Sequence, residues 1–178
     1  DANARRPSEA FVELFERVAQ KAHKNLRREG MEMVRLIDST PIPLPRMCEW
    51  ALSNGRIHGL KMHVVYDPCA DCPERVEFSQ ANVNDVEIGR KTTLERGAAY
   101  VFDKAYYSFD WWAQIHAAGA TFVTRPKSDT RFETLAQRAM GKTEGDGFTV
   151  LEDAEVALLG KRARKLDMPL RLVRVARD

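Results

Sequence analysis

Two aspartates follow short apolar stretches that have the composition of buried strands. In "VRLIDST", Asp38 directly follows Ile37, which is expected in a core. In "AAYVFDKAYY", Asp103 directly follows Phe102, which is also expected in a core. When two carboxylates meet, a divalent cation between them relieves their repulsion. Mg²⁺ and Mn²⁺ prefer such oxygen ligands and support hydrolysis and transfer of phosphodiesters. If the fold brings the two stretches together, Asp38 and Asp103 are therefore a candidate metal site and a candidate catalytic pair.

The elements that would position this pair can be read from periodicity and from turn residues. An amphipathic helix is predicted over residues 8–29. Five strands are predicted at 33–39, 57–66, 75–81, 98–103 and 120–127, with helices at 84–97 and 108–119. The segment "TPIPLP" after the first strand is expected to be extended loop, because proline has no N–H to donate to a central ladder.

The order of these elements predicts a specific sheet. Three consecutive strands favour antiparallel pairing, and the two later strands, each preceded by a helix, favour right-handed crossovers into parallel pairing. This order matches the ribonuclease H-like fold, in which the first and fourth strands are neighbours at the centre of the sheet. Adjacent strands lie about 4.8 Å apart, so Asp38 and Asp103 would share one end of the sheet. The predicted class is therefore α/β, with an RNase H-like mixed sheet.

The pattern changes after residue 127. A short helix is predicted over "RFETLAQRAM", followed by a polar loop and by strands over "FTVLEDAEVAL" and "PLRLVRVARD". We interpret residues 128–178 as a partial β-rich insertion into the core. The predicted organisation is an N-terminal helix and linker over 1–32, a catalytic core over 33–127 and the insertion over 128–178.

Composition places few limits on function. The chain has 178 residues, of which 44% are hydrophobic and 30% charged, with a net charge of +2. No apolar run is long enough to span a membrane, and the start "DANARRPSEA" has no signal segment. We therefore expect a cytoplasmic, nucleoid-associated protein without a membrane partner. Because the first residue is not Met, we also expect the chain to begin inside a longer reading frame.

The three cysteines leave two interpretations open. Cys69 and Cys72 form a C-x-x-C pair within "DPCADCP", which is either a plain turn with two thiols or half of a zinc site. A zinc site would need two further ligands, and the candidates are Cys48, His58 and His63.

Several cationic and aromatic residues are candidates for contact with a nucleic acid. They lie on the strand beside the first aspartate, just after the second aspartate, or at the end of the fifth strand, where ordinary structural roles are the competing explanation. The candidates are Lys61, His63, Lys104, Tyr106, Arg125 and Lys127. Of the two adjacent tryptophans, Trp112 fits the apolar stripe of its helix, and Trp111 is expected at the surface.

Three stretches together resemble one family. "LIDSTPI", "GLKMHVVYDP" and "YVFDKAYYSFDWWAQIHAAGATFVTRPKSD" are similar to bacterial insertion-sequence transposases with a DDE catalytic domain, in particular the insertion-sequence-four-like group. The resemblance covers about residues 33–175. It implies that Asp38 and Asp103 are the first and second catalytic acids, with Mg²⁺ or Mn²⁺ as cofactor. It also implies DNA cleavage at element ends, strand transfer to target DNA, and a homo-oligomer in a synaptic complex.

Two features depart from the family pattern. Ala105 replaces the glycine that usually follows in "DKAYY", which is a small change unless the backbone there needs a positive φ. The family's third acid is a glutamate in a Y-x-x-R-x-x-x-E-x-x-x-x-x-x-K block, and this block is absent. Four glutamates of the C-terminal region are not expected to replace it: Glu133, Glu144, Glu152 and Glu155.

The missing block keeps other functions open. We expect an incomplete transposase catalytic domain, truncated before the third acid. One alternative is a catalytically inactive remnant that binds DNA or oligomerises. Another is a nuclease or resolvase on the same fold, which would need a third acid in the same chain.

Overall fold

The computed structural model describes residues 9–26, 33–139, 147–160, 163, 166 and 168–177. The chain forms two compact units, one of residues 1–107 and 114–125 and the other of residues 108–113 and 126–178. In the part of the chain that the structure describes, no helix has both the length and the apolar character needed to cross a membrane.

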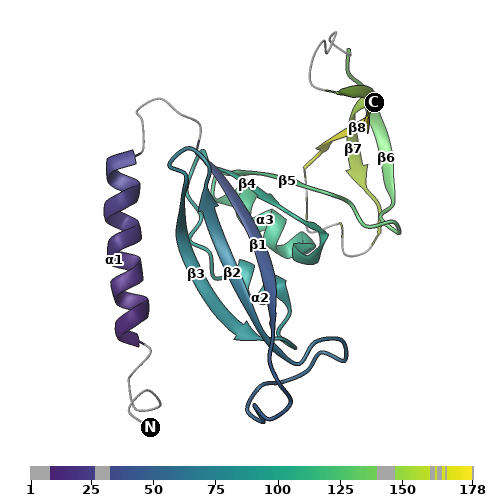
Figure 1. Ribbon diagram of the computed structural model, residues 1–178. Coiled ribbons are helices and arrows are strands. Elements are labelled where there is room, and N and C mark those ends of the chain that lie inside the picture. The colour runs from purple at the N-terminus through teal and green to yellow at the C-terminus, as the bar shows by residue number, and fades with distance from the viewer. Residues whose placement is uncertain are drawn as a thin grey trace. The chain divides into compact units, whose positions relative to one another are not determined.

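The first unit is built on a five-stranded mixed sheet with the order β3-β2-β1-β4-β5 (Figure 1). Its strands are β1 (Val34–Pro43), β2 (Gly59–Asp67), β3 (Cys72–Gln80), β4 (Ala99–Phe102) and β5 (Thr121–Thr124). The pairs β1–β2 and β2–β3 are antiparallel, whereas β1–β4 and β4–β5 are parallel. The predicted α/β class, the mixed sheet and the adjacency of the first and fourth strands are therefore confirmed, and the topology is that of an RNase H-like fold.

Strand β1 is longer than the sequence predicts. We expected "TPIPLP" to be loop, but β1 runs through Pro41 to Pro43 and pairs with β2 to the end. Amide directions alternate along a strand, and the Leu44 N–H donates to the His58 carbonyl, on the β2 side. The nitrogens of Pro41 and Pro43 therefore face the opposite side, where, among the described residues, the pairing of β1 ends at Ile37. Because no ladder bond is required there, proline is tolerated.

Helix α1 (Glu9–Leu26) lies beside β3 (Figure 1). It agrees with the predicted helix, although positions 8 and 27–29 are outside the described residues. Only part of the predicted apolar stripe is covered, since Ala19 is buried while Phe11, Leu14 and Val18 remain exposed.

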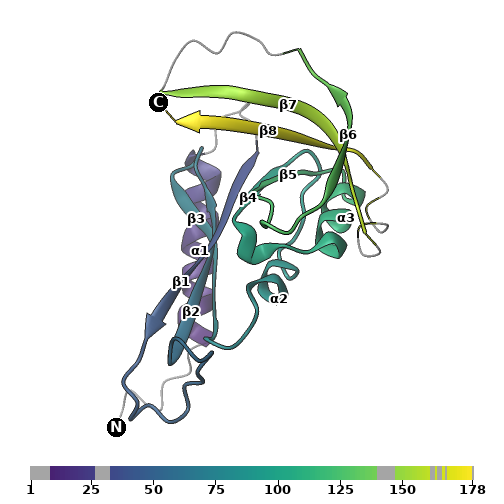
Figure 2. The ribbon, with the colours of Figure 1, turned by 90° about the vertical axis from the view of Figure 1, so that its right-hand side faces the viewer.

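Helix α2 (Asp85–Gly89) is much shorter than predicted and lies on one face of the sheet (Figures 1 and 2). The Asn84 side chain caps it by accepting the Val86 N–H. After Gly89 the chain continues in turns, in which Thr92 N–H donates to the Gly89 carbonyl, and Gly97 has a φ of 81°. Glycine and β-branched threonine are poor helix formers, which explains why the helix does not reach Gly97.

Helix α3 (Phe109–Ala117) follows a 3₁₀ turn, η1 (Lys104–Tyr106). The side chains of Trp111 and Trp112 are 0% and 2% exposed. The expectation that Trp111 lies at the surface is therefore wrong, because this helix is covered around more of its circumference than a single stripe.

The second unit contains a three-stranded antiparallel sheet with the order β6-β7-β8 (Figure 2). Its strands are β6 (Phe132–Gln137), β7 (Phe148–Leu158) and β8 (Leu170–Arg177). The last two confirm the predicted strands. The predicted helix over 131–140 is wrong, because β6 pairs with β7 from Phe132 opposite Leu158 to Gln137 opposite Ala154. Cross-strand pairing overrides the helical propensity of its alanine and leucine.

A buried arginine links β1 to the neighbouring part of the first unit. Arg35 is 1% exposed, and its guanidinium lies 3.0 Å from the Asp67 carboxylate and 3.1 Å from the Glu95 carboxylate. It also forms an ion pair with Glu74. Asp67 accepts further bonds from the backbone N–H groups of Cys69 and Ala70, so this cluster fixes the turn between β2 and β3.

Candidate metal centre

The two aspartates of the sequence prediction directly follow the last paired residues of two neighbouring parallel strands. The last paired rows join Ile37 to Phe102 and Phe102 to Thr124. The next residues of the three parallel strands are Asp38, Asp103 and Arg125. Neighbouring strands are about 4.8 Å apart, and side chains in register point to the same face. Asp38 is not the end of its strand as predicted, but it is the first residue of β1 beyond the pairing with β4.

Local hydrogen bonds orient each carboxylate. The Ser39 N–H donates to Asp38 Oδ1 at 2.8 Å. The Ala105 N–H donates to Asp103 Oδ1 at 2.6 Å, so Asp103 caps η1. The Arg125 guanidinium lies 3.9 Å from Asp103 Oδ2. The Asp103 side chain is 40% exposed, and Asp38 is exposed as well, so both can be reached from solvent.

The alanine that departs from the family pattern causes no strain. Among the non-glycine residues that the structure describes, a positive φ occurs only at Asp71. Ala105 therefore has an ordinary backbone conformation, and the glycine of the family pattern is not needed for geometry here.

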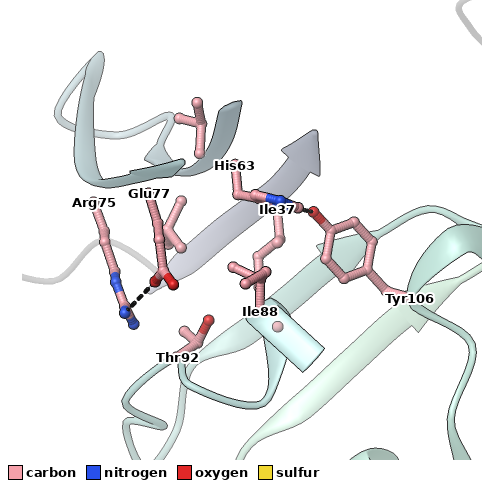
Figure 3. A pocket seen from close by; sticks show the side chains of 10 residues that line it. Ile37, His63, Arg75, Glu77, Ile88, Thr92 and Tyr106 are labelled. Carbon is pink, nitrogen blue, oxygen red and sulfur yellow. Dashed lines mark hydrogen bonds and ion pairs between the residues drawn. The ribbon is translucent and has the colours of Figure 1, made fainter. Parts of the chain in front are cut away.

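Close in sequence to the acids or on the neighbouring strand, Tyr106 and His63 form a buried pair (Figure 3). The Tyr106 hydroxyl and His63 Nδ1 are 3.3 Å apart, and His63 Nε2 is 2.8 Å from Ser79 Oγ. Burial lowers the pKa of His63 and so favours its neutral form, with smaller opposing effects from charges such as Asp85. Burial also raises the pKa of Tyr106, as do the charges of Asp85, Asp38 and Asp103, while a hydrogen bond with Ser39 lowers it.

A small pocket adjoins this pair. Its volume is about 10 Å³, room for about one water molecule, and Ile37, Ile88 and Thr92 line it together with His63 and Tyr106 (Figure 3). It is too small to bind a substrate.

The candidate DNA contacts divide into two groups. Lys61 forms a 2.8 Å ion pair with Asp85 and donates to the Val83 carbonyl, and His63 and Tyr106 are buried. Since these three side chains contact other protein groups, we do not propose them as DNA contacts. The second group is exposed: Lys104 in η1, Arg125 after β5, and Lys127 in the second unit.

Two carboxylates suit a hard cation that retains other ligands. Mg²⁺ is commonly held by one or two protein carboxylates together with waters and substrate phosphates, and Asp38 with Asp103 supplies such a donor set. The described residues contain no group of three or more His, Cys, Asp or Glu side chains arranged to hold a metal. Glu144 lies outside them.

The thiols of the C-x-x-C pair differ in environment. Neither forms a disulfide, and Cys72 is buried, which raises its pKa, with Asp67 adding to the effect. The Cys69 N–H donates to Asp67, so the segment forms an ordered turn.

Sequence comparisons agree with the resemblance that the motifs suggest. Residues 29–167 match the family described as "Transposase DDE domain". The chain is 54% identical over 177 residues to "Putative transposase y4zB" of Sinorhizobium fredii, which covers 99% of the chain and 50% of that relative. The chain thus spans about half the length of the curated relative it matches. A search of solved structures gave no match. The chain belongs to the family of transposases with a DDE domain.

Proposed function

We propose that this chain contributes the metal-binding acids of a transposase that cuts DNA at the ends of an insertion sequence and joins the ends to target DNA. The observation that carries the proposal is the register of β1 and β4, which makes Asp38 and Asp103 neighbours immediately beyond Ile37 and Phe102. Family membership supplies the class of reaction.

The three residues Asp38, Asp103 and Arg125 have separate roles in this proposal. Asp38 and Asp103 hold a divalent cation, Mg²⁺ or Mn²⁺, through the carboxylate oxygens that face solvent. When bound, the ion supplies the positive charge that activates a nucleophile and stabilises the leaving oxygen of a phosphodiester. Arg125 is a phosphate contact next to Asp103 and draws the DNA backbone toward the acids.

Metal binding tests the central claim. We expect calorimetric titration of Mn²⁺ into the chain to show binding that weakens by about tenfold or more in Asp38→Asn and in Asp103→Asn, since even outer-shell partners of a metal typically contribute that much. Each substitution keeps the shape of the side chain and removes one charged ligand. Thermal unfolding of both variants, measured in parallel, verifies that they fold.

Asp71→Asn is the matched control. Asp71 is an exposed aspartate in the turn between β2 and β3, and its φ of 49° is one that asparagine also tolerates. Removing the charge of Asp71 should leave Mn²⁺ binding unchanged. Equal binding in wild type, Asp38→Asn and Asp103→Asn would contradict the proposal and favour a remnant that binds DNA or oligomerises without catalysis.

Arg125→Ala tests the phosphate contact. The Arg125 side chain is 76% exposed, and we expect its removal to weaken binding of duplex DNA by about three- to tenfold at low salt. The slope of log K against log salt should fall by about 1, as expected for one lost phosphate contact. Fluorescence anisotropy at several salt concentrations measures both quantities.

Arg56→Ala removes the same charge from another exposed position of the first unit, in the loop between β1 and β2. If net charge alone decided DNA affinity, the two variants would lose equal affinity. That result would remove Arg125 from the site.

A further inference from the structure

We propose that Tyr106 is a positioning residue whose hydroxyl fixes the separation of Asp38 and Asp103. The proposal rests on the metal-binding role of the two acids and adds a residue that the register alone does not assign. Tyr106 contacts neither metal nor DNA in this scheme and acts through Ser39 and through η1.

The sheet alone does not hold the two acids together. The pairing of β1 with β4 ends at Ile37 and Phe102, one residue before the acids. Beyond that row β1 continues to Pro43, whereas the segment that follows β4 leaves the sheet and turns into η1. The separation of the two carboxylates therefore depends on a contact between β1 and η1.

Tyr106 makes this contact. It is the last residue of η1, and its side chain is 0% exposed. Its hydroxyl lies 3.3 Å from His63 Nδ1 on β2, and His63 is the residue paired with Ser39 across β1 and β2. A side-chain hydrogen bond with Ser39, the residue that follows Asp38, lowers the pKa of Tyr106. On the η1 side, Asp103 accepts the Ala105 N–H at 2.6 Å. A closed path of covalent bonds and hydrogen bonds thus joins the two acids through Tyr106.

The hydrogen bonds of this path can be assigned a direction. Ser79 Oγ donates to the Gln80 carbonyl at 3.2 Å, so it accepts from His63 Nε2. In neutral histidine the other nitrogen is then an acceptor, and His63 Nδ1 takes the Tyr106 hydroxyl proton. The phenol oxygen is left to accept from Ser39. Removing the hydroxyl would break the contacts to His63 and Ser39 together.

Phenylalanine at this position isolates the hydroxyl. The Tyr106 ring packs against Phe102, with 6.2 Å between ring centroids, and a phenylalanine ring keeps that contact. Tyr100→Phe is the matched control. Tyr100 is 1% exposed, and its hydroxyl accepts the Glu95 N–H at 2.8 Å and donates to the Thr93 carbonyl. The Tyr100→Phe variant therefore loses an equally buried hydroxyl that has other partners.

The experiment compares wild type, Tyr106→Phe, Tyr100→Phe and Ser39→Ala by two readouts. Calorimetric titration should show Mn²⁺ binding weakened by about three- to tenfold in Tyr106→Phe and Ser39→Ala, the effect of the Tyr106–Ser39 hydrogen bond that both variants lose, and unchanged in Tyr100→Phe. The double variant Tyr106→Phe/Ser39→Ala should bind no more weakly than either single variant, because both remove the same link.

Amide hydrogen exchange gives the second readout and needs no metal. The Ser39 and Ala105 amides donate to the two carboxylates, and their exchange should speed up about tenfold in Tyr106→Phe, as local opening becomes easier, but not in Tyr100→Phe. Similar exchange rates at these two amides in both variants would overturn the positioning role. If wild type showed no aspartate-dependent Mn²⁺ binding, the metal proposal would fail while the exchange comparison would still decide the role of Tyr106.

Discussion

Replacing Arg35 with methionine is expected to lower the free energy of unfolding by about 3–5 kcal/mol, the range found when one partner of a buried ion pair is removed. Arg35 is 1% exposed and holds Asp67, Glu74 and Glu95 together. Methionine fills much of the same volume but leaves three carboxylates without their shared cation. Asp67 is affected most, because it is itself 1% exposed.

Arg75→Met provides the comparison for this prediction. Arg75 lies on β3 and pairs with Glu77 at 2.6 Å, but its side chain is 35% exposed. A partly solvated pair of this kind contributes about 0–1 kcal/mol. Urea unfolding of both variants, followed by circular dichroism, measures the difference. Equal losses in the two variants would mean that burial does not determine the contribution of the Arg35 cluster.

Replacing Gly59 with alanine is expected to cost about 3–5 kcal/mol, because backbone strain and a steric clash add together. Gly59 has a φ of 155° and begins β2 opposite Pro43. A Cβ atom there would lie 2.1 Å from the Ile42 carbonyl oxygen and 3.0 Å from the Leu44 nitrogen. Both are backbone atoms, so relief requires β1 and β2 to separate where β1 extends past the acids.

Gly55→Ala separates the two contributions. Gly55 also has a positive φ, 86°, but a Cβ atom there would have no neighbour within 4 Å. Its expected cost is about 1 kcal/mol from the backbone conformation alone. Thermal unfolding of the two variants compares them directly. A Gly59→Ala variant as stable as Gly55→Ala would show that the two strands relax without cost.

The sheet could be predicted from the sequence because each strand has a strong apolar pattern and clear flanking turns. Two of the failures, at the prolines of β1 and at β6, share one physical cause, since they depend on partners distant in the chain. Proline at 41 and 43 argues against a strand unless the missing neighbour on one side of β1 is known. Likewise, the sequence of residues 132–137 favours a helix, and only the pairing with β7 makes this segment a strand.

The same reasoning applies to the candidate site. The acids could be proposed in advance because the strand order alone makes β1 and β4 neighbours. The environments of Lys61 and His63 could not, because their side chains are engaged by Asp85 and Ser79, which are 24 and 16 residues away. Sequence alone does not show whether a cation or an imidazole beside a strand that carries a candidate acid faces solvent or the interior.

The two prolines of β1 have a consequence for association between molecules. An unpaired strand edge with regularly spaced N–H groups invites another strand to add to it, which leads to domain swapping or aggregation. On the open side of β1, the backbone nitrogens at 41 and 43 carry no hydrogen, so an incoming strand would find carbonyl acceptors without matching donors. The edge beside the acids is thereby protected against strand addition by a second protein chain.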